Sequence, residues 1–310
     1  MKNKNLRILF LYPNLNMSTL VPNAISILTA VLKQANFNNI DLFDTTFYKS
    51  EEISKDEDRV KVGQVQPFNF DERNIKLKTT DMYKDFTDKV NKFNPDIIFA
   101  SIVEDTFPIF INFMELIENK KILCLAGGVF PSSAPERVIK LDFVNYVCRG
   151  EGEGALVDLA NALEEGKDTS KIANLWVKKN GKIIAKNPIR PALDVNTLPV
   201  QDLSIFEDIT LHRPMMGKIY RMAPVETQRG CPYACRFCNS PEKNEFYAAQ
   251  EAGRFFRKRT MKHLHAELKE IISKFGIEYI FLLQILFWQC RKKSLMNFVK
   301  CIQNSSYLFL

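Results

Sequence analysis

Short apolar runs alternate with stretches of helical periodicity along the first half of the chain. Residues Arg7–Tyr12 (RILFLY) form an apolar run that ends at Pro13, which predicts a buried strand. In Val21–Gln34 the apolar side chains recur on one face, which predicts a helix. The same alternation predicts further strands at Asp41–Thr45, Asp96–Ile102, Ile122–Ala126 and Phe143–Cys148. It predicts further helices at Asp81–Phe93, Phe107–Glu118 and Pro135–Lys140, and from Gly150-Glu-Gly-Glu153 to Leu163.

This order of elements predicts an α/β domain over residues 1–165. Strands that alternate with helices at this spacing are joined by right-handed crossovers and pair as an open parallel sheet. We expect a flavodoxin-like strand order, with the ligand crevice at the carboxyl ends of the strands. Residues Ser50–Thr80 are polar and charged, and we expect them to form a surface insertion.

The next segment, residues 166–217, is predicted to be a hairpin followed by a linker. Asn180-Gly181 lies between two runs of strand-forming residues and is a strong signal for a two-residue hairpin. Residues 218–310 then begin a second series of strands and helices. That series is predicted to contain a strand at Val225–Gln228, a helix at Met261–Lys274 and a strand at Tyr279–Leu283.

Three cysteines, Cys231, Cys235 and Cys238, follow the first of these strands. Thiolates at this spacing in a loop can converge on one cluster, and thiolates are the ligands that iron–sulfur clusters require. Three ligands leave one iron of a 4Fe–4S cluster open to a substrate or cofactor. Two alternatives stay open, a zinc site completed by a remote histidine and three unrelated structural cysteines. The histidines of the chain are His212, His263 and His265.

The residues around these cysteines resemble a known family. The stretch Glu226-Thr-Gln-Arg-Gly-Cys231-Pro-Tyr-Ala-Cys235-Arg-Phe-Cys238 is similar to the motif of radical S-adenosylmethionine (SAM) enzymes, especially the branch with a cobalamin-binding domain. The resemblance implies that the three thiolates hold a 4Fe–4S cluster and that SAM chelates the fourth iron. It also implies reductive cleavage of SAM for radical chemistry, such as methyl transfer to an unknown substrate. The electrons would come from a donor such as flavodoxin or ferredoxin.

One aromatic residue inside the motif has two interpretations. The resemblance implies that Phe237, directly before the last cysteine, packs near the adenine of SAM. Without the resemblance, Phe237 is an aromatic side chain on a surface loop.

The N-terminal half resembles the cobalamin-binding domain of the same branch over most of Leu6–Leu163. Two stretches carry this resemblance, Ala126-Gly-Gly-Val-Phe-Pro-Ser132 and Val147-Cys-Arg-Gly-Glu-Gly-Glu153. Cobalamin is therefore expected to contact Gly127 and Gly128, where the backbone can approach a ligand, and Ser101 at the end of the neighbouring strand. The alternative is that the two glycines only make a tight turn. The loop Pro13–Pro22 has no histidine to replace the lower axial ligand of cobalt, so cobalamin could bind without a protein ligand or not at all.

The C-terminal segment departs from the family pattern. The family has an acidic pair after the strand that corresponds to Tyr279–Leu283, and this chain has Gln284-Ile-Leu-Phe-Trp-Gln-Cys290. The segment after Gly230 is also short, because a full β/α barrel has ~250 residues. We therefore expect an incomplete radical SAM domain, truncated or frameshifted. The alternative function is a non-catalytic remnant that binds only cobalamin, a cluster, or both.

Composition and charge add few constraints. A hydrophobic content of 46% and a charged content of 25% are typical of a soluble globular protein. The net charge of +7 fits a solvated basic surface better than a nucleic-acid partner. The chain has no apolar run of the ~18 residues that a membrane helix needs and no secretory leader, so we expect no membrane partner. Seven cysteines, three of them clustered, indicate metal chemistry in a reducing cytoplasm.

Overall fold

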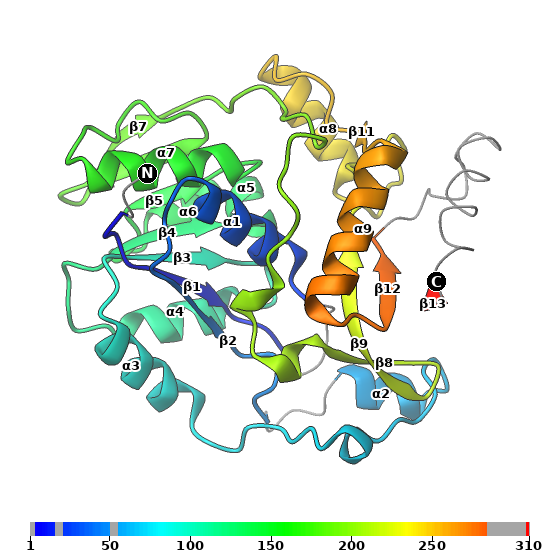
Figure 1. Ribbon diagram of the computed structural model, residues 1–310. Coiled ribbons are helices and arrows are strands. Elements are labelled where there is room, and N and C mark those ends of the chain that lie inside the picture. The colour runs from blue at the N-terminus through cyan, green and yellow to red at the C-terminus, as the bar shows by residue number, and fades with distance from the viewer. Residues whose placement is uncertain (1–3, 16–20, 50–54, 284–307, 310) are drawn as a thin grey trace. The chain divides into compact units, whose positions relative to one another are not determined.

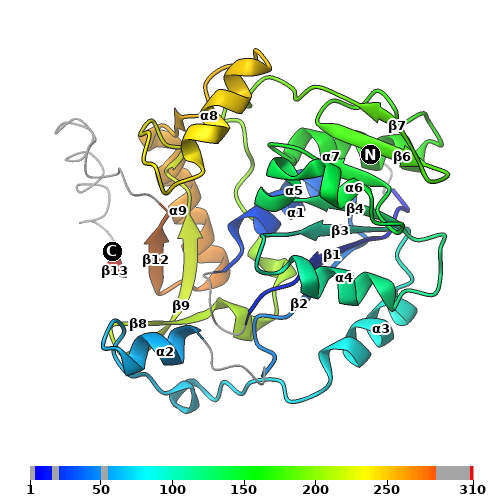
Figure 2. The same cartoon turned by 180° about the vertical axis from the view of Figure 1, so that it is seen from behind.

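A computed structural model of the chain describes residues 4–15, 21–49, 55–283 and 308–309. The chain divides into two compact units (Figures 1 and 2). The first unit consists of Met1–Thr19, Leu28–Pro67 and Asn74–Arg190. The second unit consists of Leu20–Ile27, Phe68–Arg73 and Pro191–Leu310. Among the described residues, every helix is too short or too polar to cross a membrane.

The first unit is built on a sheet of five parallel strands in the order β2-β1-β3-β4-β5. This is the flavodoxin-like order that the sequence predicts, so the fold prediction is confirmed. The parallel strands are β1 (Ile8–Tyr12), β2 (Ile40–Asp44), β3 (Ile97–Ser101), β4 (Leu123–Gly127) and β5 (Tyr146–Cys148).

Helices cover both faces of this sheet. Figures 1 and 2 show α1 and α7 over one face and α3 and α4 over the other. The central strands β1 and β3 are buried over almost their whole length and are continuous apolar runs, whereas the edge strand β2 is partly buried and contains Asp41 and Asp44. The helices that precede the hairpin are α1 (Asn23–Gln34), α2 (Lys55–Lys61), α3 (Met82–Phe93), α4 (Phe107–Glu115), α5 (Val129–Ser133), α6 (Pro135–Ile139) and α7 (Glu153–Glu164).

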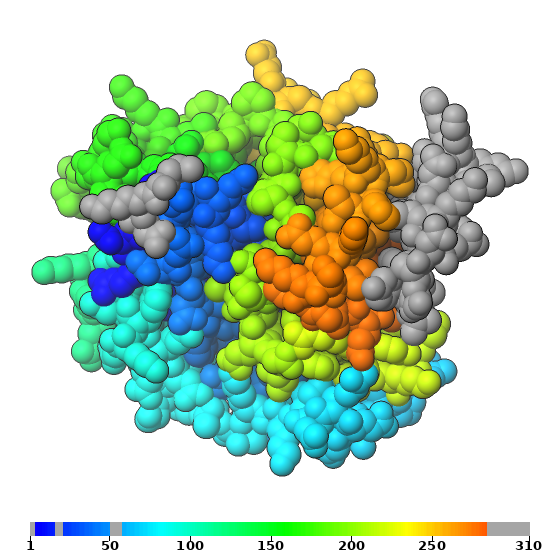
Figure 3. All heavy atoms as spheres, in the orientation of Figure 1, coloured from blue at the N-terminus to red at the C-terminus, as the bar shows by residue number. Residues whose placement is uncertain are grey.

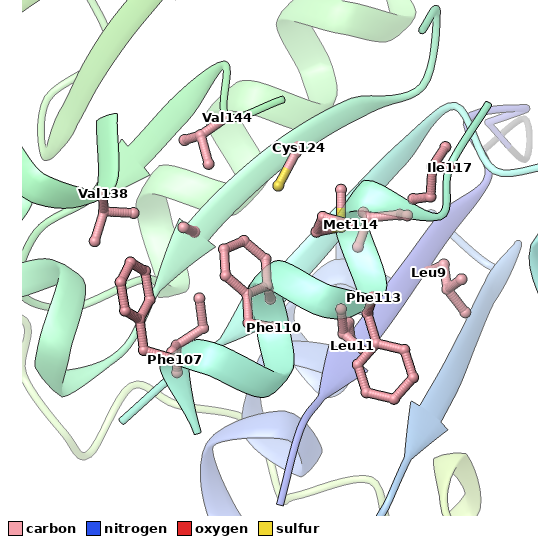
Figure 4. Close-up of a cluster of buried hydrophobic side chains, with 14 of the residues drawn as sticks. Leu9, Leu11, Phe107, Phe110, Phe113, Met114, Ile117, Cys124, Val138 and Val144 are labelled. Carbon is pink, nitrogen blue, oxygen red and sulfur yellow. The ribbon is translucent and has the colours of Figure 1, made fainter. Parts of the chain in front are cut away.

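The core under α4 shows how one face is filled. Phe110 and Phe113 of α4 are fully buried, and they belong to the same cluster as Leu9, Leu11 and Cys124 of the strands (Figure 4). Aromatic rings of this size contribute much of the apolar area that folding removes from water. The core therefore lies between α4 and the centre of the sheet.

The predicted hairpin is present, and it extends the sheet. Strands β6 (Leu175–Lys179) and β7 (Lys182–Lys186) are antiparallel, and Asn180 and Gly181 at the turn have φ values of 51° and 74°. Both residues thus have the positive φ that a tight two-residue hairpin requires. Strand β6 pairs with β5, so that Trp176 lies opposite Val147 and is buried. The hairpin belongs to the first unit rather than to a linker, because its side chains complete the edge of that core.

The second unit contains the start of a β/α series. Strand β9 (Lys218–Val225) pairs in parallel with β12 (Tyr279–Leu282), and the long helix α9 (Met261–Phe275) comes between them in the sequence. Strand β8 (His212–Met215) is antiparallel to β9, and β13 (Leu308–Phe309) is parallel to β12. Figure 3 shows α9 on the surface of the second unit.

One expectation for this part of the chain needs correction. The strand predicted at Val225–Gln228 ends at Val225, and a separate two-residue strand, β10 (Gln228–Arg229), pairs with β11 (Arg257–Lys258). The segment predicted as a surface insertion, Ser50–Thr80, contains a short helix, η1 (Phe70–Arg73), which has no buried side chain and clusters with the second unit. Its Arg73 forms an ion pair of 3.1 Å with Glu278, a contact between residues too distant in sequence to be seen in a local pattern.

Candidate functional site

The cysteine loop connects β10 to helix α8 (Ser240–Ala249) in the second unit. It begins at Gly230, whose φ is 80°. A Cβ atom at this position would lie 2.6 Å from the carbonyl oxygen of Phe255, which is too close for any side chain. Glycine is thus required directly before Cys231, because the backbone turns there against the Phe255 backbone, which precedes β11.

Helix α8 contacts the loop at its first and last cysteine. The Ser240 amide and the Ser240 hydroxyl each lie 3.4 Å from the Cys238 sulfur, at hydrogen-bond distance for a thiol. The Asn244 side chain donates a hydrogen bond of 2.9 Å to the Cys231 carbonyl. Hydrogen bonding with the Ser240 hydroxyl and with the Ser240 amide lowers the pKa of the Cys238 thiol below its ordinary value. This hydrogen bonding favours the thiolate, which is the form that binds metals.

The three thiols fit a cluster by their chemistry. All three are free, Cys231 is half-buried, and Cys235 and Cys238 are exposed. Within the described part of the chain, no three His, Cys, Asp or Glu side chains are already grouped around one point. The donor set is nonetheless the right one for iron, with three soft ligands in one short loop.

Two of the histidines that a zinc site could use have other contacts. His212 Nδ1 lies 3.0 Å from the Asp208 carbonyl oxygen. His263 Nε2 lies 3.0 Å from Nη2 of Arg259, a group that can only donate. These contacts favour the cluster interpretation over the zinc interpretation.

Phe237 is the most exposed large apolar side chain among the described residues, with 94% of its surface accessible, and Tyr233 of the same loop is 44% exposed. Both side chains are accessible to a ligand at the cysteine loop. The expected contact of Phe237 with the adenine of SAM stays a prediction.

A buried ion pair contacts the backbone between β9 and the cysteine loop. Arg259 and Glu267 form this pair, each with only 2% of its side chain exposed. Arg259 also donates a hydrogen bond of 3.2 Å to the Glu226 carbonyl, at the carboxyl end of β9. Burial raises the pKa of Glu267, and the charge of Arg259 opposes that effect. Glu226 itself forms an ion pair of 3.0 Å with Arg229, so charged groups surround the point where β9 leads into the loop.

Sequence reasoning did not assign roles to Ser240, Asn244, Arg259 or Glu267. Helix α8 has one buried side chain, Tyr247, and so lacks the apolar stripe that reveals a helix. The available signals were the Ser-Pro pair at the start of α8, which is typical of a helix N-terminus, and the two acidic residues inside α9, of which Glu267 is one.

The candidate cobalamin residues lie at the carboxyl edge of the first unit's sheet. Ser101 ends β3 and lies opposite Gly127, which ends β4. A Cβ atom on Gly127 would meet neighbours at 3.6 Å or more, which is ordinary contact. The described residues would therefore accommodate a methyl group at Gly127 and do not themselves require a glycine there.

Gly128 differs from its neighbour. Its φ is 107°, and a Cβ atom would lie 2.6 Å from the Ile102 carbonyl oxygen. The fold itself therefore requires glycine at this position, which supports the tight-turn interpretation for Gly128. The Ser132 hydroxyl then links this turn to the next loop, since it donates to the Gly128 carbonyl at 2.7 Å and accepts from the Gly150 amide at 3.0 Å.

The same edge has apolar and polar features that suit a cofactor. Val103 and Val129 follow β3 and β4, and they are 47% and 37% exposed. The loop after β1 is held by Asn14, whose side chain donates to the Thr46 hydroxyl at 2.8 Å. Residues 16–20 of that loop lie outside the described part of the chain, and the loop sequence has no imidazole.

Comparisons with known proteins support this organisation. Residues 18–160 match the B12 binding domain family, and this range contains Ser101, Gly127 and Gly128. The chain is 26% identical over 221 residues to an uncharacterised methyltransferase of Pyrococcus horikoshii, covering 69% of this chain and 44% of that protein. It is 27% identical over 127 residues to an anaerobic magnesium-protoporphyrin IX monomethyl ester cyclase of Synechocystis, covering 38% of this chain and 23% of that protein.

Two solved structures share the fold. The cobalamin-dependent SAM radical enzyme OxsB, with aqua-cobalamin and SAM bound, matches with a TM-score of 0.67 and 17% identity over 98% of this chain and 38% of its own. The radical SAM methyltransferase TsrM from Kitasatospora setae matches with a TM-score of 0.58 and 16% identity over 90% of this chain and 47% of its own. The chain spans less than half the length of each of these four proteins.

Proposed function

We propose that the chain is an iron–sulfur enzyme of the radical SAM superfamily that uses SAM and cobalamin in a radical reaction such as methyl transfer. The match of residues 18–160 to the B12 binding domain family and the resemblance of the cysteine loop to the radical SAM motif support this proposal. The observation that carries the proposal is the cysteine loop. The loop lies between Gly230 and helix α8 and has three free thiols, and α8 forms hydrogen bonds with its first and last cysteine. The similarity to a protein named as a methyltransferase supports the reaction class.

The residues of the second unit have separate roles in this proposal. Cys231, Cys235 and Cys238 hold a 4Fe–4S cluster, and Phe237 packs near the adenine of SAM. When bound, such a cluster supplies the electron that cleaves SAM. The rest of the loop orients the ligands, because Gly230 sets the turn and Asn244 holds the carbonyl of Cys231. The electron donor is a protein such as flavodoxin or ferredoxin.

The first unit binds cobalamin at the carboxyl edge of its sheet. Gly127 lets the ligand approach the backbone, and Ser101 beside it offers a hydroxyl for a hydrogen bond. Val103 and Val129 present apolar surface next to these two residues. Since the loop after β1 has no imidazole, it supplies no histidine to the cobalt.

The test is anaerobic reconstitution with iron and sulfide, followed by counting iron per chain and by assaying 5′-deoxyadenosine after reduction with SAM present. Replacing Cys231, Cys235 or Cys238 with alanine should abolish stable loading, because each thiolate is a ligand. Cys124→Ala is the matched control. That thiol is fully buried in β4, so its loss should leave the iron content unchanged.

Different outcomes separate the proposal from its alternatives. A Cys235→Ala protein that still holds four irons would contradict the ligand assignment. Zinc as the only metal after anaerobic purification would replace the cluster with a structural site. A chain that loads a cluster and cobalamin but yields no 5′-deoxyadenosine would be a binding protein, which is the second candidate function.

A further inference from the structure

Helix α8 begins two residues after the last cysteine of the loop, and its first residue contacts that cysteine directly. The Cys238 thiol donates a hydrogen bond of 3.4 Å to the Ser240 hydroxyl, and the Ser240 amide donates one of 3.4 Å to the Cys238 sulfur. A thiolate has no proton to give, so when Cys238 is ionised the Ser240 hydroxyl donates to the sulfur. Hydrogen bonds to an ionised acceptor are roughly twice as strong as those between neutral groups.

A second contact from the same helix fixes the geometry of this interaction. Asn244 lies one helical turn after Ser240, and its side chain donates a hydrogen bond of 2.9 Å to the Cys231 carbonyl. A turn between Cys235 and Cys238 is closed by a backbone hydrogen bond of 3.1 Å. The loop is therefore held against α8 at its first and last cysteine, and Ser240 keeps its position beside Cys238.

We propose that Ser240 is a positioning residue that raises the reduction potential of the cluster by donating its hydroxyl hydrogen bond to the Cys238 sulfur. This inference rests on the proposed function, because it requires the cluster. Reduction adds one negative charge to the cluster and its thiolates. A donor aimed at one of those sulfurs stabilises the reduced state more than the oxidised state.

The test compares Ser240→Ala, which removes the hydroxyl but keeps the amide, with Ser240→Thr, which keeps both donors. The measurement is the fraction of reduced cluster, followed by its EPR signal during an anaerobic titration with a low-potential reductant. At the potential where the natural protein is half reduced, the ratio of reduced to oxidised cluster in Ser240→Ala should fall about fivefold. A tenfold change corresponds to about 59 mV for a one-electron couple. Ser240→Thr should restore the ratio.

Ser273→Ala is the matched control, because Ser273 is also a helical serine and its hydroxyl donates to the Glu270 carbonyl of its own helix. It should leave the ratio unchanged. Equal potentials in the natural protein and Ser240→Ala, with equal iron content, would overturn the inference while leaving the proposed function intact. Loss of iron in Ser240→Ala with full loading in Ser240→Thr would also overturn it, since Ser240 would then hold the cluster rather than tune it. Absence of a cluster in the natural protein would instead refute the proposed function.

Discussion

The two adjacent glycines at the end of β4 differ in what a side chain would contact at each position. At Gly128 a side chain would collide with the backbone of Ile102, and the φ of 107° with ψ of −166° is a region that only glycine occupies readily. At Gly127 a side chain would meet only ordinary contacts. Gly128 is therefore required by the fold, whereas the described residues would accommodate a methyl group at Gly127.

This difference predicts two distinct phenotypes. Gly128→Ala should destabilise the first unit by about 2 kcal/mol or more, because of backbone strain and the overlap with Ile102. Gly127→Ala should keep the stability close to that of the natural protein and weaken cobalamin binding, since its methyl group occupies space that the ligand needs. Thermal unfolding and titration with hydroxocobalamin measure the two effects. Unchanged cobalamin affinity in Gly127→Ala would show that the ligand does not approach this strand end.

At the scale of elements, the buried pair Arg259–Glu267 connects helix α9 to the carboxyl end of β9. Removing one partner leaves the other as an unpaired charge with 2% of its side chain exposed, and such a loss typically costs 3–5 kcal/mol. Arg259→Met should therefore destabilise the second unit by about 3 kcal/mol in urea unfolding. The double variant Arg259→Met, Glu267→Leu should recover most of that loss, because it buries no charge.

The control for the Arg259–Glu267 pair is an exposed ion pair, which also joins a basic and an acidic side chain. Lys84 and Asp88 of α3 pair at 2.8 Å with 72% and 62% of their side chains exposed. Lys84→Met should change the stability by about 0.5 kcal/mol or less, because water and salt screen exposed pairs. Equal effects of Arg259→Met and Lys84→Met would show that burial does not strengthen the Arg259 pair.

At the scale of the whole molecule, the first unit should fold without the second, provided that it keeps its hairpin. Residues 1–190 contain all seven strands of the sheet, and few contacts usually cross a boundary between compact units. A fragment of residues 1–190 should therefore unfold in one cooperative thermal transition. A fragment of residues 1–171 lacks β6 and β7, and it should lose about 3 kcal/mol or more because the buried Trp176 and the strand beside β5 are missing. Equal unfolding temperatures for the two fragments would mean that the hairpin adds nothing to the core.

The sequence by itself determined the features that depend on neighbours along the chain. The central parallel strands were predictable because they are buried on both faces and so are apolar runs, as in Ile8–Tyr12. The hairpin was predictable because Asn180-Gly181 favours positive φ at both turn positions. The candidate cluster ligands were recognisable because Cys231, Cys235 and Cys238 are spaced within one loop.

Tertiary structure alone decided the features whose partners are distant or lack a pattern. The hairpin joins the sheet because Trp176 lies opposite Val147, a pairing that turn chemistry does not specify. Gly230 is required because of Phe255, and Gly128 because of Ile102, so each depends on a backbone that the chain brings back from elsewhere. Helix α8 has almost no buried apolar face, and its importance comes from hydrogen bonds to the cysteine loop. Such contacts form only after the chain has folded, because they join groups whose proximity no local preference determines.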